Sequence, residues 1–294
     1  MTKILYFDTS SGVSGDMFVG ALIDAGADIE TIRKHINSLG LDGVSVRARK
    51  VNKNGLIGTK FDVLDSNTGL DVDAHHAHAH DHGHDHDHGH SHEHGHDDGH
   101  GHKHYHGHTD KHPHKHRRGL QAISDIISKS YLPQQVIDDS LAVFRLLAAA
   151  EAKVHGTTLE EVHFHEVGAL DCIVDIVSAV SAVHQLEIDE TWCSPLHVGS
   201  GTIRCAHGIL PVPAPATLEL LQGVPIYSTE IKGELVTPTG AALIKHFSKK
   251  FAPMPQMVVE RVGYGAGSKD FGIPNLLRAS IGVVTETAAP GNEA

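Results

Sequence analysis

The chain has 294 residues, a formal net charge of −12 and 40% hydrophobic residues, which suffices for one large or two modest folded domains. An acidic chain without a basic stripe is a poor nucleic-acid binder, and no apolar run reaches the ~20 residues that a membrane span needs. The first residues enter a strand pattern directly and the three cysteines suggest no disulfide framework, so we expect a cytoplasmic protein.

The first 25 residues follow a strand, turn and helix pattern. Residues 3–8 predict a short buried strand with Asp8 at its end, residues 9–16 a small polar loop, and residues 17–25 a helix. Such a turn presents backbone N–H groups and a helix N-terminus to an anion. A tight turn with Asp16 as N-cap explains the pattern equally well. The candidate substrate-binding residues here are Asp8, Gly12, Ser14, Gly15 and Asp16.

A helix over residues 29–38 should follow. Residues 44–51 and 58–64 then alternate apolar and polar, which predicts two antiparallel strands around a turn at 52–55.

Residues 75–116 are a histidine-rich tract that holds 20 of the 28 histidines. The tract has almost no apolar residues to bury, so it is expected to be disordered. Imidazole suits nickel, copper and zinc, and such tracts are a compositional sign of metal binding. A solvated linker that binds metal incidentally is the alternative. The candidate metal ligands in its alternating core are His80, His82, His84, His86, His88, His90, His92, His94 and His96.

After the tract, residues 120–129 and 133–155 predict helices that core packing alone explains. A His-x-His-Glu motif at 163–166 then precedes a helix over about 169–186. Asp171 and Asp175 share one face of that helix, where like charges repel unless a cation or donor lies between them. With His165 and Glu166 they form a candidate ligand set or acid–base group. The alternative is a solvated helix edge with an acidic first turn.

Residues 192–216 predict short strands and turns, in which His207 is a further candidate metal ligand. Thr237 and Pro238 predict an N-cap and first position of a helix that ends near residue 247. Its N–H groups and the hydroxyls of Thr237 and Thr239, with Gly240, offer a second anion site. A well-capped helix without a ligand is an equal alternative. The last strand is expected at 279–284.

Five ordered motifs resemble those of the LarC-type family, the nickel-insertion proteins of nickel-pincer cofactor synthesis. They are residues 7–8 with 12–17 (Gly-Val-Ser-Gly-Asp-Met), 164–171 with Asp175, 207–216, 237–241 and 263–267. Many members of that family carry a His-rich insert at the same place. The resemblance covers residues 3 to about 284.

The resemblance implies a nickel chelatase acting on pyridinium-3,5-bisthiocarboxylic acid mononucleotide. Nickel would be inserted between two thiocarboxylate sulfurs and the ring carbon between them, giving the cofactor that lactate racemase receives. Family members use CTP, with Mg²⁺ or Mn²⁺, mainly through a C-terminal domain without a counterpart here, so turnover is expected to need a longer form or a partner chain. Metallation must remove a ring proton, for which Glu166 or His165 is the candidate base, while Asp171, Asp175 and His207 are candidates to hold the ion.

We therefore expect a mixed α/β fold in one main domain, assembled as a homo-oligomer. The domain would comprise residues 1–70 and 119–284, interrupted by a disordered insert at 71–118 and followed by a flexible tail at 285–294. Two other functions remain open. One is a nickel store or chaperone without chemistry of its own, and the other is a metal-dependent phosphoester hydrolase that uses Asp8, Asp16, Asp171 and Asp175.

Overall fold

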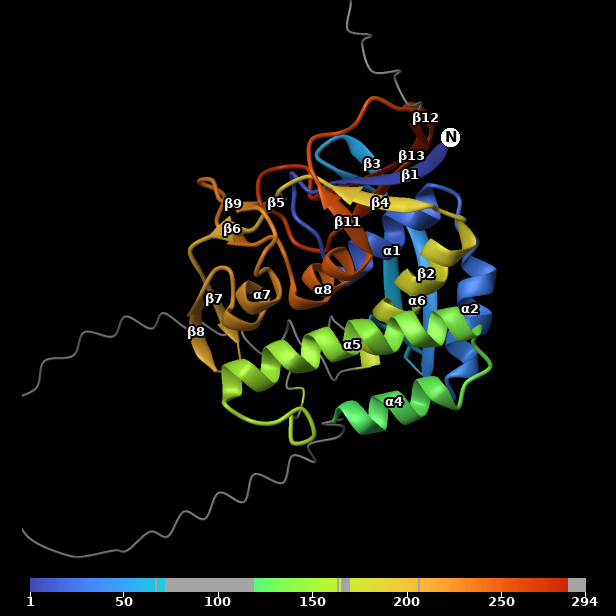
Figure 1. Ribbon diagram of the computed structural model, residues 1–294, viewed down its shortest axis with the longest axis vertical. Helices are drawn as coiled ribbons and strands as arrows, with labels where there is room; N and C mark the ends of the chain where they lie inside the picture. Colours follow the sequence, from blue (N-terminus) through green and yellow to red (C-terminus); the bar gives the residue numbers. More distant parts are fainter. Residues whose placement is uncertain (67, 72–118, 163, 165–169, 206, 285–294) are drawn as a thin grey trace, which may run out of the picture.

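A seven-stranded mixed sheet organises the computed structural model, which describes residues 1–66, 68–71, 119–162, 164, 170–205 and 207–284 (Figure 1). The strand order is β11-β4-β1-β13-β12-β3-β2. Strands β11 and β4 run parallel to β1, whereas β13 is antiparallel to both of its neighbours. The bounds are β1 Thr2–Asp8, β2 Val44–Lys53, β3 Leu56–Asp65, β4 Glu190–Cys193, β11 Ser248–Phe251, β12 Val258–Ala266 and β13 Leu276–Val284. The mixed α/β class predicted from the sequence is confirmed.

The continuous apolar run of β1 fits its central position. Ile4, Leu5, Tyr6 and Phe7 are all buried, as expected for a strand covered on both faces. The strand ends at Asp8, and α1 (Gly15–Asp24) and α2 (Ile29–Ser38) follow.

The predicted hairpin is confirmed as β2 and β3, which pair antiparallel from Val44 with Asp65 to Lys53 with Leu56. Its turn places Asn54 at φ 52° and Gly55 at φ 90°. Asn-Gly tolerates this left-handed backbone, which matches the twist of the two strands.

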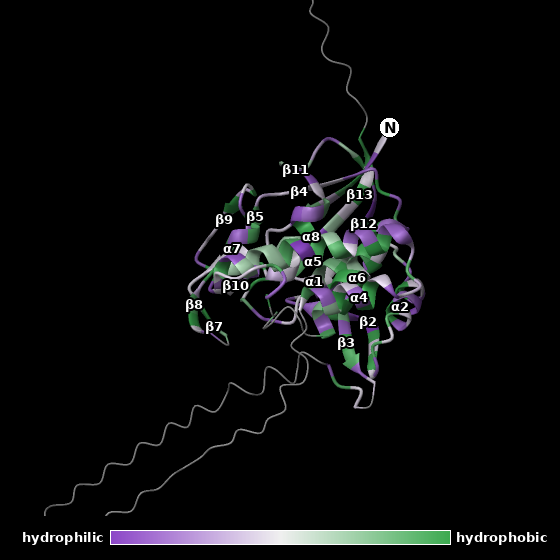
Figure 2. Ribbon diagram, turned by 60° about the horizontal axis from the view of Figure 1, so that its bottom comes forward, coloured by the Kyte–Doolittle hydropathy of each residue, from purple (hydrophilic) through white to green (hydrophobic). Residues whose placement is uncertain are grey.

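Helices pack on the sheet in two layers. Helices α1, α2, α6 (Leu170–Gln185) and α8 (Pro238–Phe247) contact strands, α5 (Gln134–His155) lies on α6 and α8, and α4 (Leu120–Ser128) lies on α5 (Figure 1). Every residue from Ile173 to Val183 except Asp175 is buried, and Figure 2 shows α6 largely in the hydrophobic colour. Each fully buried Val or Ile contributes about 2 kcal/mol relative to an exposed one, so α6 is fixed firmly in the core.

Short elements gather at one end of the molecule, beyond α5 and α8 (Figure 1). They are β5 Leu196–His197, β6 Gly199–Ser200, β7 Thr202–Cys205, β8 Gly208–Pro211, α7 Pro215–Leu220, β9 Ile226–Tyr227 and β10 Gly233–Glu234. Strands β7 and β8 form a hairpin, and β10 pairs with β6. Among the helices that the structure describes, none is long and apolar enough to cross a membrane.

The histidine tract lies outside the described residues, as does most of the His-x-His-Glu segment, including His165 and Glu166. The predicted insert at 71–118 and tail at 285–294 therefore stay predictions.

Candidate functional site

Two loops that are more than 200 residues apart in sequence pair at the edge of the helical layer. The N–H of Val13 donates to the carbonyl of Leu235 at 2.9 Å, and the N–H of Thr237 donates to the carbonyl of Val13 at 3.1 Å. The approach needs glycine, because a Cβ on Gly12 would stand 2.1 Å from the Leu235 carbonyl oxygen. The pairing brings the N-terminus of α1 beside that of α8.

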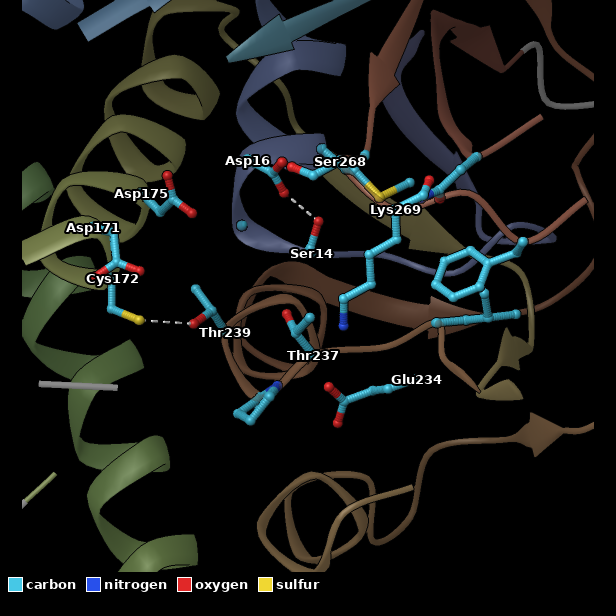
Figure 3. Close-up of a pocket in the computed structure, with 17 residues that line it drawn as sticks. Ser14, Asp16, Asp171, Cys172, Asp175, Glu234, Thr237, Thr239, Ser268 and Lys269 are labelled. Atoms are coloured by element: carbon cyan, nitrogen blue, oxygen red, sulfur yellow. Dashed lines mark hydrogen bonds between the residues drawn. The ribbon is translucent and has the colours of Figure 1, made fainter. Parts of the chain in front are cut away.

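A cavity of about 410 Å³ opens in front of these two helix ends (Figure 3). This volume lies in the range of small-molecule sites. Five segments line the cavity: residues 14–17, Asp171, Cys172 and Asp175 of α6, residues 234–239 except Val236, the loop residues 267–269 after β12, and Phe271 with Asn275. Of the sequence-predicted residues, Ser14, Gly15, Asp16, Asp171, Asp175, Thr237 and Thr239 therefore meet in one place.

Asp16 is held by two partners inside this arrangement. Ser14 donates its hydroxyl hydrogen to one carboxylate oxygen, and the Lys60 ammonium lies 2.5 Å from the other. The expectation that Asp16 caps α1 is wrong, because the N-cap residue is Ser14 and Asp16 lies within the first turn. The Asp16 carboxylate instead forms a long-range ion pair with Lys60 of β3.

Lys60 is a buried ammonium that faces three carboxylates. Burial opposes its charge, but attraction to Asp16, reinforced by Asp175 and Asp62, outweighs this and raises the pKa of Lys60 above its usual value. Lys60 therefore supplies a permanent positive charge beneath the acidic side of the cavity.

Asp171 and Asp175 project from α6 into the cavity on the side opposite Lys269 (Figure 3). Between them in sequence, Cys172 places its Sγ 3.5 Å from the hydroxyl oxygen of Thr239. Two carboxylates four residues apart on a rigid helix can share a divalent cation. Within the described ranges, no group of three or more His, Cys, Asp or Glu side chains is placed to hold a metal ion by itself.

Comparison with known proteins decides the family. The sequence model described as "Nickel insertion protein" matches residues 5–293. The chain belongs to the nickel insertion protein family.

The relatives extend well beyond this chain. A protein of Desulfitobacterium hafniense (strain DSM 10664 / DCB-2) is 44% identical over 284 residues, which cover 97% of this chain and 59% of the relative. Relatives from Geobacillus kaustophilus, 42% identical, and Staphylococcus saprophyticus, 37% identical, each overlap 98% of this chain and 62% of their own length. All three are named pyridinium-3,5-bisthiocarboxylic acid mononucleotide nickel insertion protein. The chain thus spans about three fifths of these relatives, and no solved structure matches it.

Three of the predicted substrate-binding residues are not among the described residues that line the cavity. Asp8 forms an ion pair with Arg278, Gly12 packs on Leu235, and Gly240 packs on Val13, where a Cβ would stand 2.3 Å from the carbonyl oxygen. Gly12 and Gly240 thus serve the close approach of the two loops. Their assignment to substrate stays a prediction.

His207 lies in a second cavity of about 260 Å³, apart from Asp171 and Asp175. Its ring is 5.0 Å, centroid to centroid, from that of His155. Glu151 and Cys205 line the same cavity, and Glu234 lines both cavities. The predicted trio of Asp171, Asp175 and His207 is therefore divided between two adjoining cavities in the structure.

The sequence did not identify Lys60, Lys269 or Asn275 as residues of the site. Lys60 sits in a strand among buried residues, and a charged residue at such a position is the signal that a partner must exist. Lys269 and Asn275 follow the glycine-rich motif at 263–267. The role of that motif is to pack β12 on α1, since a Cβ on Gly265 would stand 1.8 Å from the carbonyl oxygen of Met17.

Proposed function

We propose that this chain carries out the nickel-inserting step on pyridinium-3,5-bisthiocarboxylic acid mononucleotide, with nickel as a second substrate. The observation that carries the proposal is the cavity, which sets Asp171 and Asp175 on one wall and hydroxyl, N–H and ammonium donors, together with Glu234, on another. The family membership and the names of the relatives support the choice of substrate.

The roles of the residues follow from the chemistry of ring metallation. Asp171 and Asp175 hold the divalent ion before transfer, because carboxylates bind it without closing a full ligand set and so allow it to leave. His207, in the adjoining cavity, is a point through which the ion can pass. A base must accept the proton that leaves the ring carbon as the nickel–carbon bond forms. Glu166 or His165, a few residues before α6 in sequence, is proposed for that role.

The family resemblance extends the proposal to CTP, with Mg²⁺ or Mn²⁺, and to lactate racemase as recipient of the cofactor. Because the relatives are longer, we propose that nucleotide-dependent turnover requires their additional C-terminal part, present in a longer form or as a separate chain. A homo-oligomer in the cytoplasm is the proposed working state.

The two other functions fit the cavity less well. The proposed hydrolase would use four aspartates to bind metal ions. Two of these carboxylates are already engaged in ion pairs, because Asp8 pairs with Arg278 and Asp16 with Lys60. A protein that only stored nickel would not need a cavity lined with hydrogen-bond donors for an anionic ligand.

The test is to mix this chain with nickel, CTP, Mg²⁺, the bisthiocarboxylate mononucleotide and the C-terminal part of a relative, and to analyse the nucleotide by mass spectrometry. The proposal expects a nickel adduct with one proton fewer on the ring, and its loss in Asp171→Asn. The exposed Asp138→Asn on α5 is the matched control. Phosphate release that is independent of nickel would instead identify a hydrolase, and bound nickel without any adduct would identify a store.

A further inference from the structure

A pair of carboxylates and a lysine lie on opposite sides of the cavity. Figure 3 shows Asp171 and Asp175 on one side and Lys269 on the other, with Ser14 and Thr237 between them. Among the described lining residues, Lys269 is the one lysine or arginine. Lys60, which does not line the cavity, is already paired with Asp16.

The ammonium of Lys269 is available to a ligand. In the part of the chain that the structure describes, it makes no hydrogen bond or ion pair. Figure 3 shows its side chain extending into the cavity toward Thr237, with Glu234 on the same side.

The backbone beneath Lys269 is fixed by a buried amide. Asn275 is 4% exposed, and its side-chain N–H donates to the carbonyl of Lys269 at 3.0 Å. The carbonyl of Asn275 accepts from the N–H of Gly267 at 3.0 Å. Ser11 ties the neighbouring Pro274 carbonyl to the opposite loop at 2.9 Å. The loop that carries Lys269 is thus held at both ends. This lowers the entropy cost of ordering the loop when a ligand binds.

A neutral hydroxyl donor lies beside this ammonium. Thr237 accepts from the N–H of Gly240 at 3.2 Å, which leaves its hydroxyl hydrogen for a ligand. Thr239, in the first turn of α8, lines the cavity nearer to α6, with its hydroxyl oxygen 3.5 Å from Sγ of Cys172 (Figure 3). Hydroxyl and N–H donors at a helix start, together with a lysine, suit a phosphate monoester.

We infer that Lys269 binds the phosphate of the mononucleotide, which sets the direction in which the ligand lies in the cavity. The inference rests on the proposed function and adds an orientation to it. A doubly charged phosphate is attracted to Lys269, and the single carboxylate on that side, Glu234, repels it less than Asp171 and Asp175 together do on the other side. A nickel ion is attracted to the two carboxylates of α6. The phosphate therefore lies at the Lys269 end, and the pyridinium ring points toward α6. Asn275 is a positioning residue that acts through Lys269.

The experiment measures binding without nickel, so that it does not depend on insertion. Nicotinic acid mononucleotide and nicotinic acid riboside differ by the phosphate alone, and calorimetry gives the affinity of each for the parent, Lys269→Gln, Lys269→Arg and the control Lys129→Gln. Lys129, at the end of α4, is exposed, does not line the cavity and has the same charge. We expect Lys269→Gln to weaken mononucleotide binding roughly 10- to 100-fold and riboside binding by less than about twofold. Lys269→Arg should retain most of the affinity, and Lys129→Gln all of it.

The inference is overturned if the parent does not prefer the mononucleotide, or if Lys269→Gln affects both ligands equally. Its failure is distinct from failure of the proposed function. Mononucleotide binding that depends on Lys269 without any nickel adduct would refute nickel insertion alone, whereas a normal adduct yield with unaltered binding in Lys269→Gln would refute this inference alone.

Discussion

Gly15 and Asp175 touch across the base of the cavity, so closely that a Cβ on Gly15 would stand 2.5 Å from Oδ2 of Asp175 and 2.9 Å from its Cβ. Gly15 is the first residue of α1, and Asp175 lies in the second turn of α6. The absence of a side chain at residue 15 therefore sets where the Asp175 carboxylate can lie.

The first prediction concerns this contact. Gly15→Ala should destabilise the protein by about 1–2 kcal/mol, because an added methyl group overpacks a close contact, and should weaken ligand binding by displacing Asp175. Urea unfolding and calorimetry measure the two effects. Asp175→Ala removes two of the three crowding atoms, so the double variant should be more stable than the sum of the single losses predicts. A Gly15→Ala protein with the parent's stability and affinity would show that the contact relaxes freely.

The second prediction concerns the ion pair between Lys60 and Asp16. Lys60→Met should cost about 3 kcal/mol, because it leaves the Asp16 carboxylate in the cavity wall without its cation. Combining it with Asp16→Asn should recover most of this loss, since the uncompensated charge is then gone. Chemical unfolding of the four proteins provides the measurement, and additive losses would contradict the assignment.

The pH dependence of that pair follows from the raised pKa of Lys60. A group whose pKa is higher in the folded state contributes stability below its unfolded pKa, roughly 10.4 for lysine, and loses it as pH rises through the folded pKa. The gap between parent and Lys60→Met should therefore stay constant from neutral pH to about 9.

The third prediction concerns Asp62, whose side chain is fully buried between two arginines of β2. Arg49 lies 2.7 Å and Arg47 3.0 Å from Oδ2. Burial opposes the charge of this carboxylate, but the hydrogen bonds from Arg49 and Arg47 outweigh that effect and lower its pKa. A carboxyl group whose pKa falls on folding stabilises the protein above its unfolded pKa of about 3.9, and this stability is lost as pH falls through the folded value.

Asp62→Asn should therefore lower the unfolding free energy by about 2 kcal/mol at pH 7, and the difference from the parent should shrink below about pH 4. Thermal unfolding across pH 3 to 7 tests this, with the exposed Asp138→Asn as the control for loss of a surface charge. A difference that is independent of pH would show that the charge of Asp62 contributes nothing and that the loss comes from setting an amide N–H group against the guanidinium donors of Arg47 and Arg49.

Local features of this fold can be predicted, because their causes lie within a few residues. Asn54 and Gly55 specify the hairpin turn by their tolerance of positive φ, and Thr237 with Pro238 specifies the start of α8, where the Thr237 oxygen accepts from Gly240 as predicted. Periodic apolar residues place α5 and α6 within a few residues of their observed ends.

The composition of the cavity is only partly predictable, because it depends on contacts between distant segments. Ser14 and Thr237 can be recognised singly, but their adjacency is produced by the pairing of Val13 with Leu235. Lys269 has no local signal at all, since its position depends on a hydrogen bond from Asn275 and on strand order in the sheet. The local pattern wrongly predicts Asp16 as the N-cap of α1, because its partner, Lys60, is 44 residues away in the sequence.

The fourth prediction concerns the histidine tract. Deleting residues 75–116 should remove most of the nickel ions that the chain binds, because those residues hold 20 of its 28 histidines. Imidazole must be neutral to bind a metal, so nickel binding by the parent should weaken as pH falls through roughly 6.5. Calorimetry of the parent and deleted proteins measures this, and an unchanged number of bound ions would show that the tract does not bind nickel.

The last prediction separates the tract from the working centre. Insertion needs ligands and a base in fixed positions, because misplacement by about 1 Å costs rate steeply. Asp171 meets this requirement, since it lies on α6, which is buried from Ile173 to Val183 apart from Asp175. Asp171→Asn and Glu166→Gln should therefore fold yet lose cofactor maturation at every nickel concentration, whereas the tract deletion should lose it only when nickel is scarce.

Activation of lactate racemase, followed across a nickel titration with CTP and the C-terminal part of a relative present, measures both effects. Asp138→Asn and Glu160→Gln, each on an exposed surface, are the matched controls. Asp171→Asn keeps the size of the side chain, and thermal unfolding of both point variants checks that they fold. If the tract deletion abolishes activation at saturating nickel while both point variants remain active, the centre lies in the tract and the assignment to Asp171 and Glu166 is wrong.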